Sequence, residues 1–267
     1  MPMWLKRLQR WRRQRQLRHK RIPIVLWERV VRDVLGHYRL DHHELHRLRE
    51  LASLFLLRKA FTGAGGLELN AYMRTVIATE ACLLILNLDL DWYDGWLEII
   101  VYPDSFVVAR DVQDDIGLIH EQRAVLGGEA WGRGPLILAW GDTLPGSRPH
   151  GPGSNVILHE FAHKLDMLNG AANGMPPLHA GMDRHAWTHV FTRAYSELQT
   201  QLMRHHYTRI DPYGAENPAE FFAVVSEEFF ELPARLHTWY PELYTQLSLF
   251  YRQDPLQRLA SSGQDRN

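Results

Sequence analysis

The chain has 267 residues, of which 45% are hydrophobic and 23% charged, a composition that excludes a disordered or fibrous protein. Its one cysteine, Cys82, cannot form an intrachain disulfide, so we expect it to be buried in a fold that needs no oxidising compartment. No apolar run approaches the roughly 18 uncharged residues that a membrane span needs, and no signal peptide is evident. We therefore expect a cytoplasmic protein.

The net charge of -1 hides a basic N-terminal segment, residues 1–21, which contains nine of the 30 Lys and Arg residues and no Asp or Glu. Trp4, Leu8 and Trp11 recur there at helical spacing, which would suit an anionic membrane surface or a nucleic acid. The alternative, which we favour, is a solvated arm, because chain termini are commonly disordered. The arm contains no base-reading motif.

Helices are expected in the next part of the chain. Asp41 is a candidate N-cap for a helix with Leu45, Leu48 and Phe55 on one face, ending near the loop at residues 62–66. A second helix is expected over residues 70–87, where apolar residues recur at core spacing.

Residues 96–140 have a different residue pattern, in which runs of β-branched and aromatic residues alternate with turn residues. We expect strands at residues 97–102, 105–109, 124–131 and 135–140. Their close succession predicts a small, mostly antiparallel sheet.

The rest of the chain reads as helical after a loop at residues 144–153 that is rich in Gly, Pro and Ser. Helices are expected at residues 154–168, 184–204, 218–230 and 233–251, the last interrupted by Pro241. The segment after Pro255 is mostly polar, and we expect it to be loose.

One segment, His159-Glu160-Phe161-Ala162-His163, has the residues of a reaction centre. On a helix, residues four apart lie one above the other, so both imidazoles can bind one Zn²⁺ ion. Glu160 lies about 100° round the axis, where it can take a proton from water on the ion without occupying the metal. We favour this interpretation over histidines that only bond to carbonyl groups, since the apolar residues here independently predict a helix with a buried face.

A second pair of histidines provides an internal comparison. His185 and His189 also stand four apart on a predicted helix, but Ala186 takes the place of the glutamate. Metal binding there would lack a general base.

A catalytic zinc ion needs a third protein ligand and an open position for water. Asp166 and Asn169 stand where the metzincin pattern requires Gly and His, which excludes that subclass. Glu220 begins an apolar helix that would hold its carboxylate inward, yet it also fits the Glu of a capping box after Asn217 and Pro218. Spacing alone leaves both roles open, and the other candidate carboxylates are Asp183, Glu216, Glu227 and Glu228.

Four separated motifs also resemble those of one family, the Mlc titration factor A family of bacterial zinc peptidases. They are Gly128-Glu129-Ala130-Trp131, Gly134-Pro135, the helix at residues 155–166 and the segment at residues 217–224. The resemblance extends over about residues 24–251. It implies aminopeptidase-like activity, with Glu220 as the third zinc ligand and Glu160 as the base.

The pattern around Tyr213 and residues 219–223 is also similar to the catalytic domain of anthrax lethal factor. This similarity implies that Glu220 binds zinc and that Tyr213 supports the oxyanion, a role that suits a phenol donor. The alternative is a core tyrosine whose hydroxyl is satisfied.

A carboxylate that braces a zinc histidine is expected as well. Thermolysin-like enzymes place an Asp four residues after the ligand Glu, but this chain has Val224 there. Asp166, on the same helix face as His159 and His163, is the candidate for this second-shell role. The alternative is an exposed residue at the helix C-terminus.

These features together predict an α+β, zincin-like metallopeptidase that binds one Zn²⁺ ion. We expect a basic arm at residues 1–21, a single domain at residues 22–255 and a polar tail at residues 256–267. A peptide or protein substrate would lie along a strand edge formed by Gly128, Glu129, Ala130 and Trp131, because backbone hydrogen bonds hold a peptide without requiring a sequence. The alternative is an internal strand with Trp131 in the core.

The second hypothesis is a regulatory binding protein. Members of the resembled family bind the glucose repressor Mlc, so sequestering such a transcriptional repressor would be the main role and hydrolysis would be secondary. The sequence itself shows no repressor-binding surface, no nucleic-acid motif and no transmembrane segment.

Overall fold

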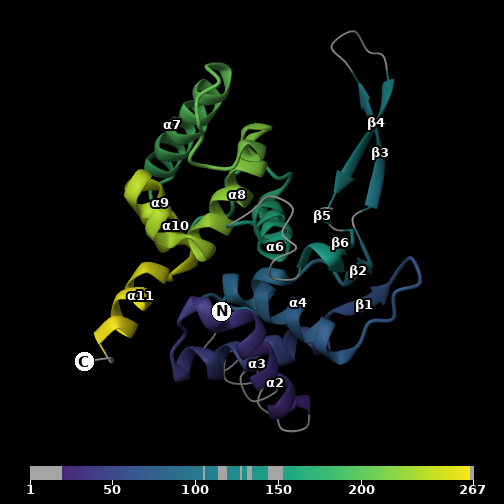
Figure 1. Cartoon of the computed structure of the whole chain (residues 1–267). Helices are drawn as coiled ribbons and strands as arrows, with labels where there is room; N and C mark the ends of the chain where they lie inside the picture. The colour runs from purple at the N-terminus through teal and green to yellow at the C-terminus, as the bar shows by residue number, and fades with distance from the viewer. Residues whose placement is uncertain are drawn as a thin grey trace.

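The computed structural model describes residues 20–104, 106–113, 119–126, 128–130, 134–143 and 153–264. Most of the predicted basic arm and of the loop at residues 144–153 therefore lies outside the described residues. A small sheet lies on one side of the molecule, and the C-terminal helices lie on the other (Figure 1).

The N-terminal part is helical. Helix α2 (Ile24–Val30) continues into a π-helical turn, η1 (Val31–Leu35), and a 3-10 turn, η2 (Gly36–Tyr38). Helix α3 (His42–Arg58) begins at Asp41, whose side chain accepts from the backbone N–H of Glu44 at 2.7 Å, in a capping box that confirms the predicted start. Helix α4 (Ala71–Leu84) follows, and the side chain of Asn70 caps it.

The sheet has the strand order β1-β2-β6-β5 and is mostly parallel. Strands β1 (Ala60–Gly63), β2 (Glu98–Tyr102) and β6 (Leu136–Ala139) pair in parallel, with Ile99 opposite both Phe61 and Leu136. Strand β5 (Gly128–Ala130) pairs antiparallel with β6 and ends this order.

The prediction of a mostly antiparallel sheet is therefore wrong. Residues 60–63, which the sequence assigned to the end of a helix and the loop after it, form β1 instead. Because α4 connects β1 to β2, the two strands run in the same direction, as strands joined by a helical crossover do. The expected strand at residues 124–131 is divided between β4 (Ile119–Leu126) and β5.

Strand β4 pairs antiparallel with β3 (Phe106–Gln113) in a separate two-stranded sheet. This hairpin lies between β2 and β5 in the sequence and extends away from the helices in Figure 1. A 3-10 turn, η3 (Leu90–Tyr93), precedes β2, and a short helix, α5 (Trp140–Thr143), follows β6.

The C-terminal half agrees with the expected helices. They are α6 (Val156–Asp166), which continues into a 3-10 turn η4 (Met167–Asn169), α7 (Arg184–Met203), α8 (Pro218–Glu231), α9 (Pro233–Trp239) and α10 (Pro241–Tyr251). A 3-10 turn, η5 (Pro212–Ala215), precedes α8. The expectation of a loose segment after Pro255 is wrong, because Pro255–Gln264 forms α11.

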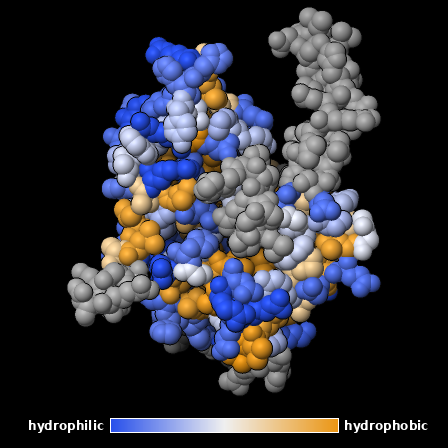
Figure 2. Space-filling model, viewed as in Figure 1, coloured by the Kyte–Doolittle hydropathy of each residue, from blue (hydrophilic) through white to orange (hydrophobic). Residues whose placement is uncertain are grey.

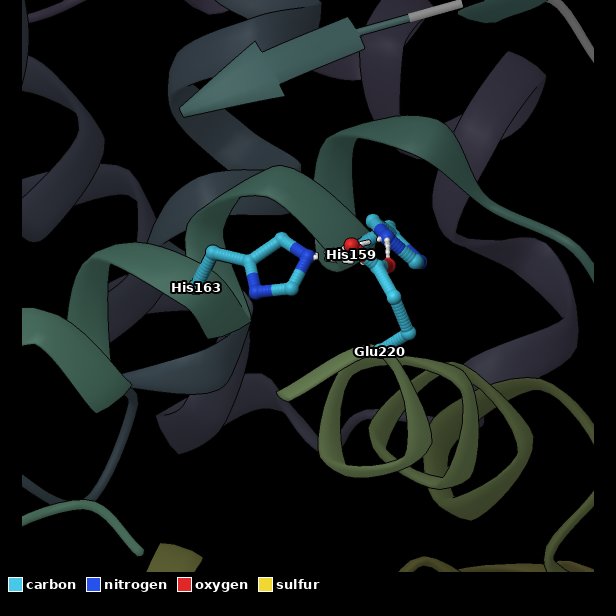
Figure 3. A group of neighbouring side chains, drawn as sticks. All are labelled: His159, His163 and Glu220. Atoms are coloured by element: carbon cyan, nitrogen blue, oxygen red, sulfur yellow. Dashed lines mark hydrogen bonds and ion pairs between the residues drawn. The ribbon is translucent and has the colours of Figure 1, made fainter. Parts of the chain in front are cut away.

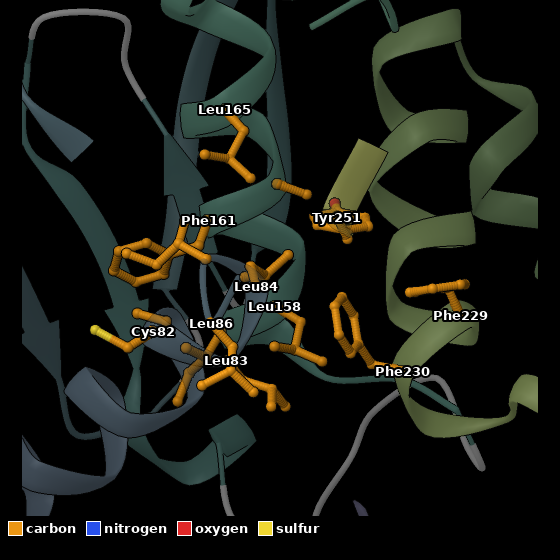
Figure 4. Packing of buried hydrophobic residues seen from close by; sticks show 14 of the residues in the cluster. Cys82, Leu83, Leu84, Leu86, Leu158, Phe161, Leu165, Phe229, Phe230 and Tyr251 are labelled. Atoms are coloured by element: carbon orange, nitrogen blue, oxygen red, sulfur yellow. The ribbon is translucent and has the colours of Figure 1, made fainter. Parts of the chain in front are cut away.

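The core holds α6 in place. Leu158, Phe161 and Leu165 of α6 are fully buried, and Figure 4 shows them between residues of α4 and residues of α8 and α10. Cys82 is buried in the same cluster, as expected. Each such apolar side chain contributes about 1.5–3 kcal/mol on burial, so the position of α6 is strongly determined.

The surface is less apolar than this interior. On the face shown in Figure 2, hydrophilic residues predominate over α7. None of the helices in the described residues is both long enough and apolar enough to cross a membrane.

Candidate metal centre

The helix that carries the candidate site begins at Asn155. The side-chain oxygen of Asn155 accepts from the backbone N–H groups of Ile157 and Leu158, both at 3.1 Å, and so caps α6. With Phe161 and Leu165 anchored in the core, the adjacent face of the helix carries His159 and His163.

His159 and His163 point toward one another from successive turns of α6 (Figure 3). Their Nε2 atoms lie 3.1 Å apart, and their ring planes are inclined at 78°. Both residues are buried, with 8% and 7% of their surface exposed. The predicted pair of imidazoles therefore converges on one point.

Glu220 completes this group from α8. The side chain of Asn217 caps α8, and Pro218 occupies its first turn. Oε2 of Glu220 lies 2.9 Å from Nε2 of His159 and 3.2 Å from Nε2 of His163. The carboxylate is thus turned toward the two histidines, as Figure 3 shows, and not toward the cap as the capping-box alternative required.

The three side chains have the donor atoms and spacing of a metal site. Their ligand atoms all lie within 4.8 Å of one another. Atoms that bind one zinc ion tetrahedrally at its usual bond lengths lie about 3.3 Å apart, close to the separations found here. Two imidazole nitrogens and one carboxylate oxygen also suit zinc chemically. The residues therefore fit a zinc ion.

The electrostatics of the group favour positive charge at its centre. Burial alone would lower the pKa of the His159 imidazole, but the charge of Glu227 and hydrogen bonds with Glu220 and Glu227 raise it well above its ordinary value. Burial would raise the pKa of Glu220, yet its contacts with His159 and His163 hold it well below the usual range. A cation is thus stabilised where these side chains meet.

Glu160 is buried in α6 beside His159, with 4% of its surface exposed. Its charge also acts on Lys164: burial lowers the pKa of the Lys164 amine to about 8, and Glu160 opposes this shift. Glu160 and Lys164 thus stand four residues apart on α6, each next to one of the two histidines.

Tyr213 and β5 are the other expected site elements. The ring of Tyr213, in η5, lies 5.8 Å from the ring of His159. Gly128, Glu129 and Ala130 form β5, which lies beside α6 and ends the order of the described strands. Trp131 lies outside the described residues.

Among the described residues, Asp166 makes no hydrogen bond to His159 or His163, the contact expected of it, although its charge interacts with His163. Its Oδ2 accepts from the backbone N–H groups of Asn173 and Gly174, at 2.8 Å and 2.7 Å, and no described side chain hydrogen-bonds to its Oδ1. Asp166 is fully buried, so the alternative of an exposed helix-end residue is also wrong. It stabilises the turn after α6.

Glu227 occupies the place that was expected for Asp166. Its Oε1 lies 2.7 Å from Nδ1 of His159, on the side of the ring away from Glu220. The sequence offered Glu227 only as one candidate metal ligand among several carboxylates. The available signal was its position seven residues after Glu220, which puts both carboxylates on one face of α8.

Comparison with known families places the chain among metallo-peptidases. Residues 8–252 match the family described as glucose-regulated metallo-peptidase M90. The chain is 42% identical to Mlc titration factor A of Salmonella agona over 229 residues, which is 84% of each chain. It is 38% identical to Mlc titration factor A of Klebsiella pneumoniae over 240 residues, which is 89% of each chain.

A further relative matches nearly the whole chain. An uncharacterized protein of Synechocystis is 40% identical over 257 residues, covering 96% of this chain and 91% of its own. These matches confirm the resemblance to the Mlc titration factor A family. The similarity to lethal factor stays a prediction.

Proposed function

The chain belongs to the glucose-regulated metallo-peptidase M90 family, and on that premise we propose that it is a zinc peptidase of the gluzincin type, whose zinc ligands are His159, His163 and Glu220. The observation that supports this proposal is the convergence of two Nε2 atoms and one carboxylate oxygen from α6 and α8. A zinc ion bound there supplies a Lewis acid that polarises a carbonyl group and lowers the pKa of water.

Two side chains of the protein carry out the remaining steps of the reaction. Glu160 takes the proton of the attacking water on its carboxylate and passes it to the leaving amine. Tyr213, beside the ring of His159, donates its phenolic O–H to the oxygen that gains charge when the carbonyl group is attacked.

The substrate is held by backbone hydrogen bonds along β5, which ends the order of the described strands and lies beside α6. Gly128, Glu129 and Ala130 supply this edge, and the predicted contribution of Trp131 extends it. Aminopeptidase activity, which the family resemblance implies, needs an acidic group for the substrate α-amine, and Glu129 is the candidate.

Two measurements test the proposal: the zinc content of the purified protein and its peptide hydrolysis. We expect about one zinc ion per chain, and we expect Glu160→Gln to abolish hydrolysis with the zinc content unchanged. His189→Gln is the control, because His185 and His189 are an exposed histidine pair on α7 with Ala186 between them. A Glu160→Gln protein that cleaves at the wild-type rate would exclude Glu160 as the base.

A second function rests on the name of the relatives, Mlc titration factor A, which links them to Mlc. In this alternative the chain sequesters a transcriptional repressor of the Mlc type, and hydrolysis is secondary. The Glu160→Gln protein separates the two functions. Full binding of the repressor by an inactive protein would favour sequestration, whereas loss of regulation together with hydrolysis would favour the enzyme.

A further inference from the structure

The His159 ring lies between two carboxylates of the same helix. Glu220 faces its Nε2 at 2.9 Å, and Glu227 faces its Nδ1 at 2.7 Å. We propose that Glu227 is the positioning residue of the metal centre: it holds the His159 ring so that Nε2 is the nitrogen that meets Glu220 and His163. This inference rests on the proposed zinc site and assigns the residue that orients it.

Glu227 acts first on the proton of the ring. An ionised carboxylate can only accept hydrogen bonds, so Nδ1 of His159 must be the donor in their contact. In the neutral ring this leaves the lone pair on Nε2, the atom directed at the centre of the site. The contact therefore fixes both the orientation of the ring and the nitrogen that is free to bind a metal ion.

Glu227 is itself held from the other side. Its Oε2 accepts the backbone N–H of Asn155 at 2.5 Å, and its side chain is almost wholly buried. Both carboxylate oxygens thus have a donor, one from α6 and one from the residue that caps α6. Rotation of the carboxylate would break one of these bonds at a largely buried position, where a lost hydrogen bond is costly.

Asn155 connects the pair formed by Glu227 and His159 to the rest of the fold. While its side-chain oxygen caps α6, its Nδ2 donates to Glu80 of α4 and Glu231 of α8, both at 2.9 Å. Tyr38 donates to the same oxygen of Glu231 at 2.5 Å. The position of Glu227 is therefore fixed by a buried network that joins three helices.

The two histidines differ in this respect. Among the described residues, no group hydrogen-bonds to Nδ1 of His163, although that atom is buried. His159 is consequently the braced ligand of the pair, and changes at Glu227 should act through His159 alone.

Glu227→Gln tests this role, because an amide cannot replace both functions of the carboxylate. The Gln side chain has one acceptor and one donor group, so its NH₂ must face either Nδ1–H of His159 or the N–H of Asn155. Glu228→Gln is the matched control: Glu228 is the next residue of α8, equally buried, and its Oε1 lies 3.0 Å from Nη2 of Arg235 instead of the site.

The first measurement is the zinc affinity of the full chain, from competition with a chromophoric chelator. We expect Glu227→Gln to weaken zinc binding about 10- to 100-fold, the effect usual for a group that supports a metal ligand, and Glu228→Gln to stay within about twofold. Wild-type affinity in Glu227→Gln, or an equal loss in both variants, would overturn the inference. Failure of the wild-type protein to bind zinc would instead overturn the proposed function.

The second measurement reads the contact itself. In the zinc-loaded wild-type protein, the Nδ1 proton of His159 should give a far-downfield imidazole N–H resonance in the NMR spectrum, as expected for a hydrogen bond to a carboxylate. In Glu227→Gln it should move upfield or disappear through exchange, while Glu228→Gln leaves it in place. An unchanged resonance in Glu227→Gln would show that another group holds the ring. Glu227→Asp, which keeps the charge but is one methylene shorter, should behave like Glu227→Gln.

Discussion

Gly174 packs against Pro218 so closely that a Cβ atom on Gly174 would lie 2.4 Å from the carbonyl oxygen of Pro218. Pro218 is the first residue of α8, the helix that carries Glu220. Asp166, at the end of α6, accepts the N–H of Gly174. The turn that contains Gly174 therefore connects α6 to α8 outside the candidate metal centre, where the ligands of the two helices meet.

Gly174→Ala should therefore destabilise the protein and weaken zinc binding. Gly66→Ala is the control, because its φ of 81° resembles the 78° of Gly174, while no neighbouring atom lies within 4 Å of the position that a Cβ on Gly66 would take. The left-handed conformation alone costs about 1–2 kcal/mol in each variant. In urea unfolding we expect Gly174→Ala to lower the free energy of unfolding by about 3 kcal/mol or more. An equal loss of unfolding free energy in the two variants would mean that the close contact with Pro218 does not affect stability.

The second prediction concerns the third ligand. Glu220→Ala should weaken zinc binding by more than about 100-fold, a larger loss than for a supporting group, because Oε2 of Glu220 is the atom that both histidines face. Glu216 is an exposed acidic residue just before α8, and the control Glu216→Ala should keep the wild-type affinity for zinc. Metal analysis after dialysis measures both. Stoichiometric, tightly held zinc in Glu220→Ala would mean that Glu220 is not a zinc ligand.

Tyr213→Phe should lower kcat about 100-fold, since one donor to the developing oxyanion is lost. Zinc affinity should not change, because the ring of Tyr213 lies beside His159 and the phenyl group of the variant keeps that contact. Steady-state kinetics with a peptide substrate measure the effect. Tyr207→Phe is the control, as Tyr207 is 86% exposed. An unchanged kcat for Tyr213→Phe would leave this tyrosine with a packing role.

The pH dependence of stability gives a fourth prediction. Burial raises the pKa of Glu228 to about 7, against the opposing charge of Arg235. Between the unfolded value of 4.5 and 7, the folded protein binds more protons than the unfolded chain, so its stability falls as the pH rises. The favourable contribution of Glu228 is complete below pH 4.5 and is lost by about pH 7.

Glu228→Gln should remove this dependence, because the amide does not titrate. The free energy of unfolding of the variant, relative to wild type, should rise from pH 4.5 to 7, by at most about 3.5 kcal/mol at 1.4 kcal/mol per pKa unit. Urea unfolding at several pH values measures it, with the exposed Glu242→Gln as control. A constant difference between variant and wild type over this range would refute the raised pKa.

Local signals in the sequence were sufficient for most helices and for the histidine pair. Asp41 and Asn217 are recognisable caps, and a spacing of four residues on a helix determines which side chains share a face. The same rule explains why the convergence of His159 and His163 could be predicted before Glu220 could be assigned.

Contacts between distant segments were not predictable in this way. The partner of Nδ1 of His159 is 68 residues away in the sequence and depends on how α6 and α8 cross. Asp166 lies on α6 as predicted, but helix position does not reveal that the turn at Asn173 and Gly174 folds back to it. The four residues of β1 are too few to show a strand pattern, so the parallel pairing was missed.

The β3–β4 hairpin separates β2 from β5 and β6 in the sequence, although β2 and β6 are direct neighbours in the sheet. Its ladder joins only its own two strands. The hairpin is thus an insertion between paired strands, and its length can vary without a change of sheet register. A change in the length of this arm should accordingly leave the pairing of β2 with β6 unaltered.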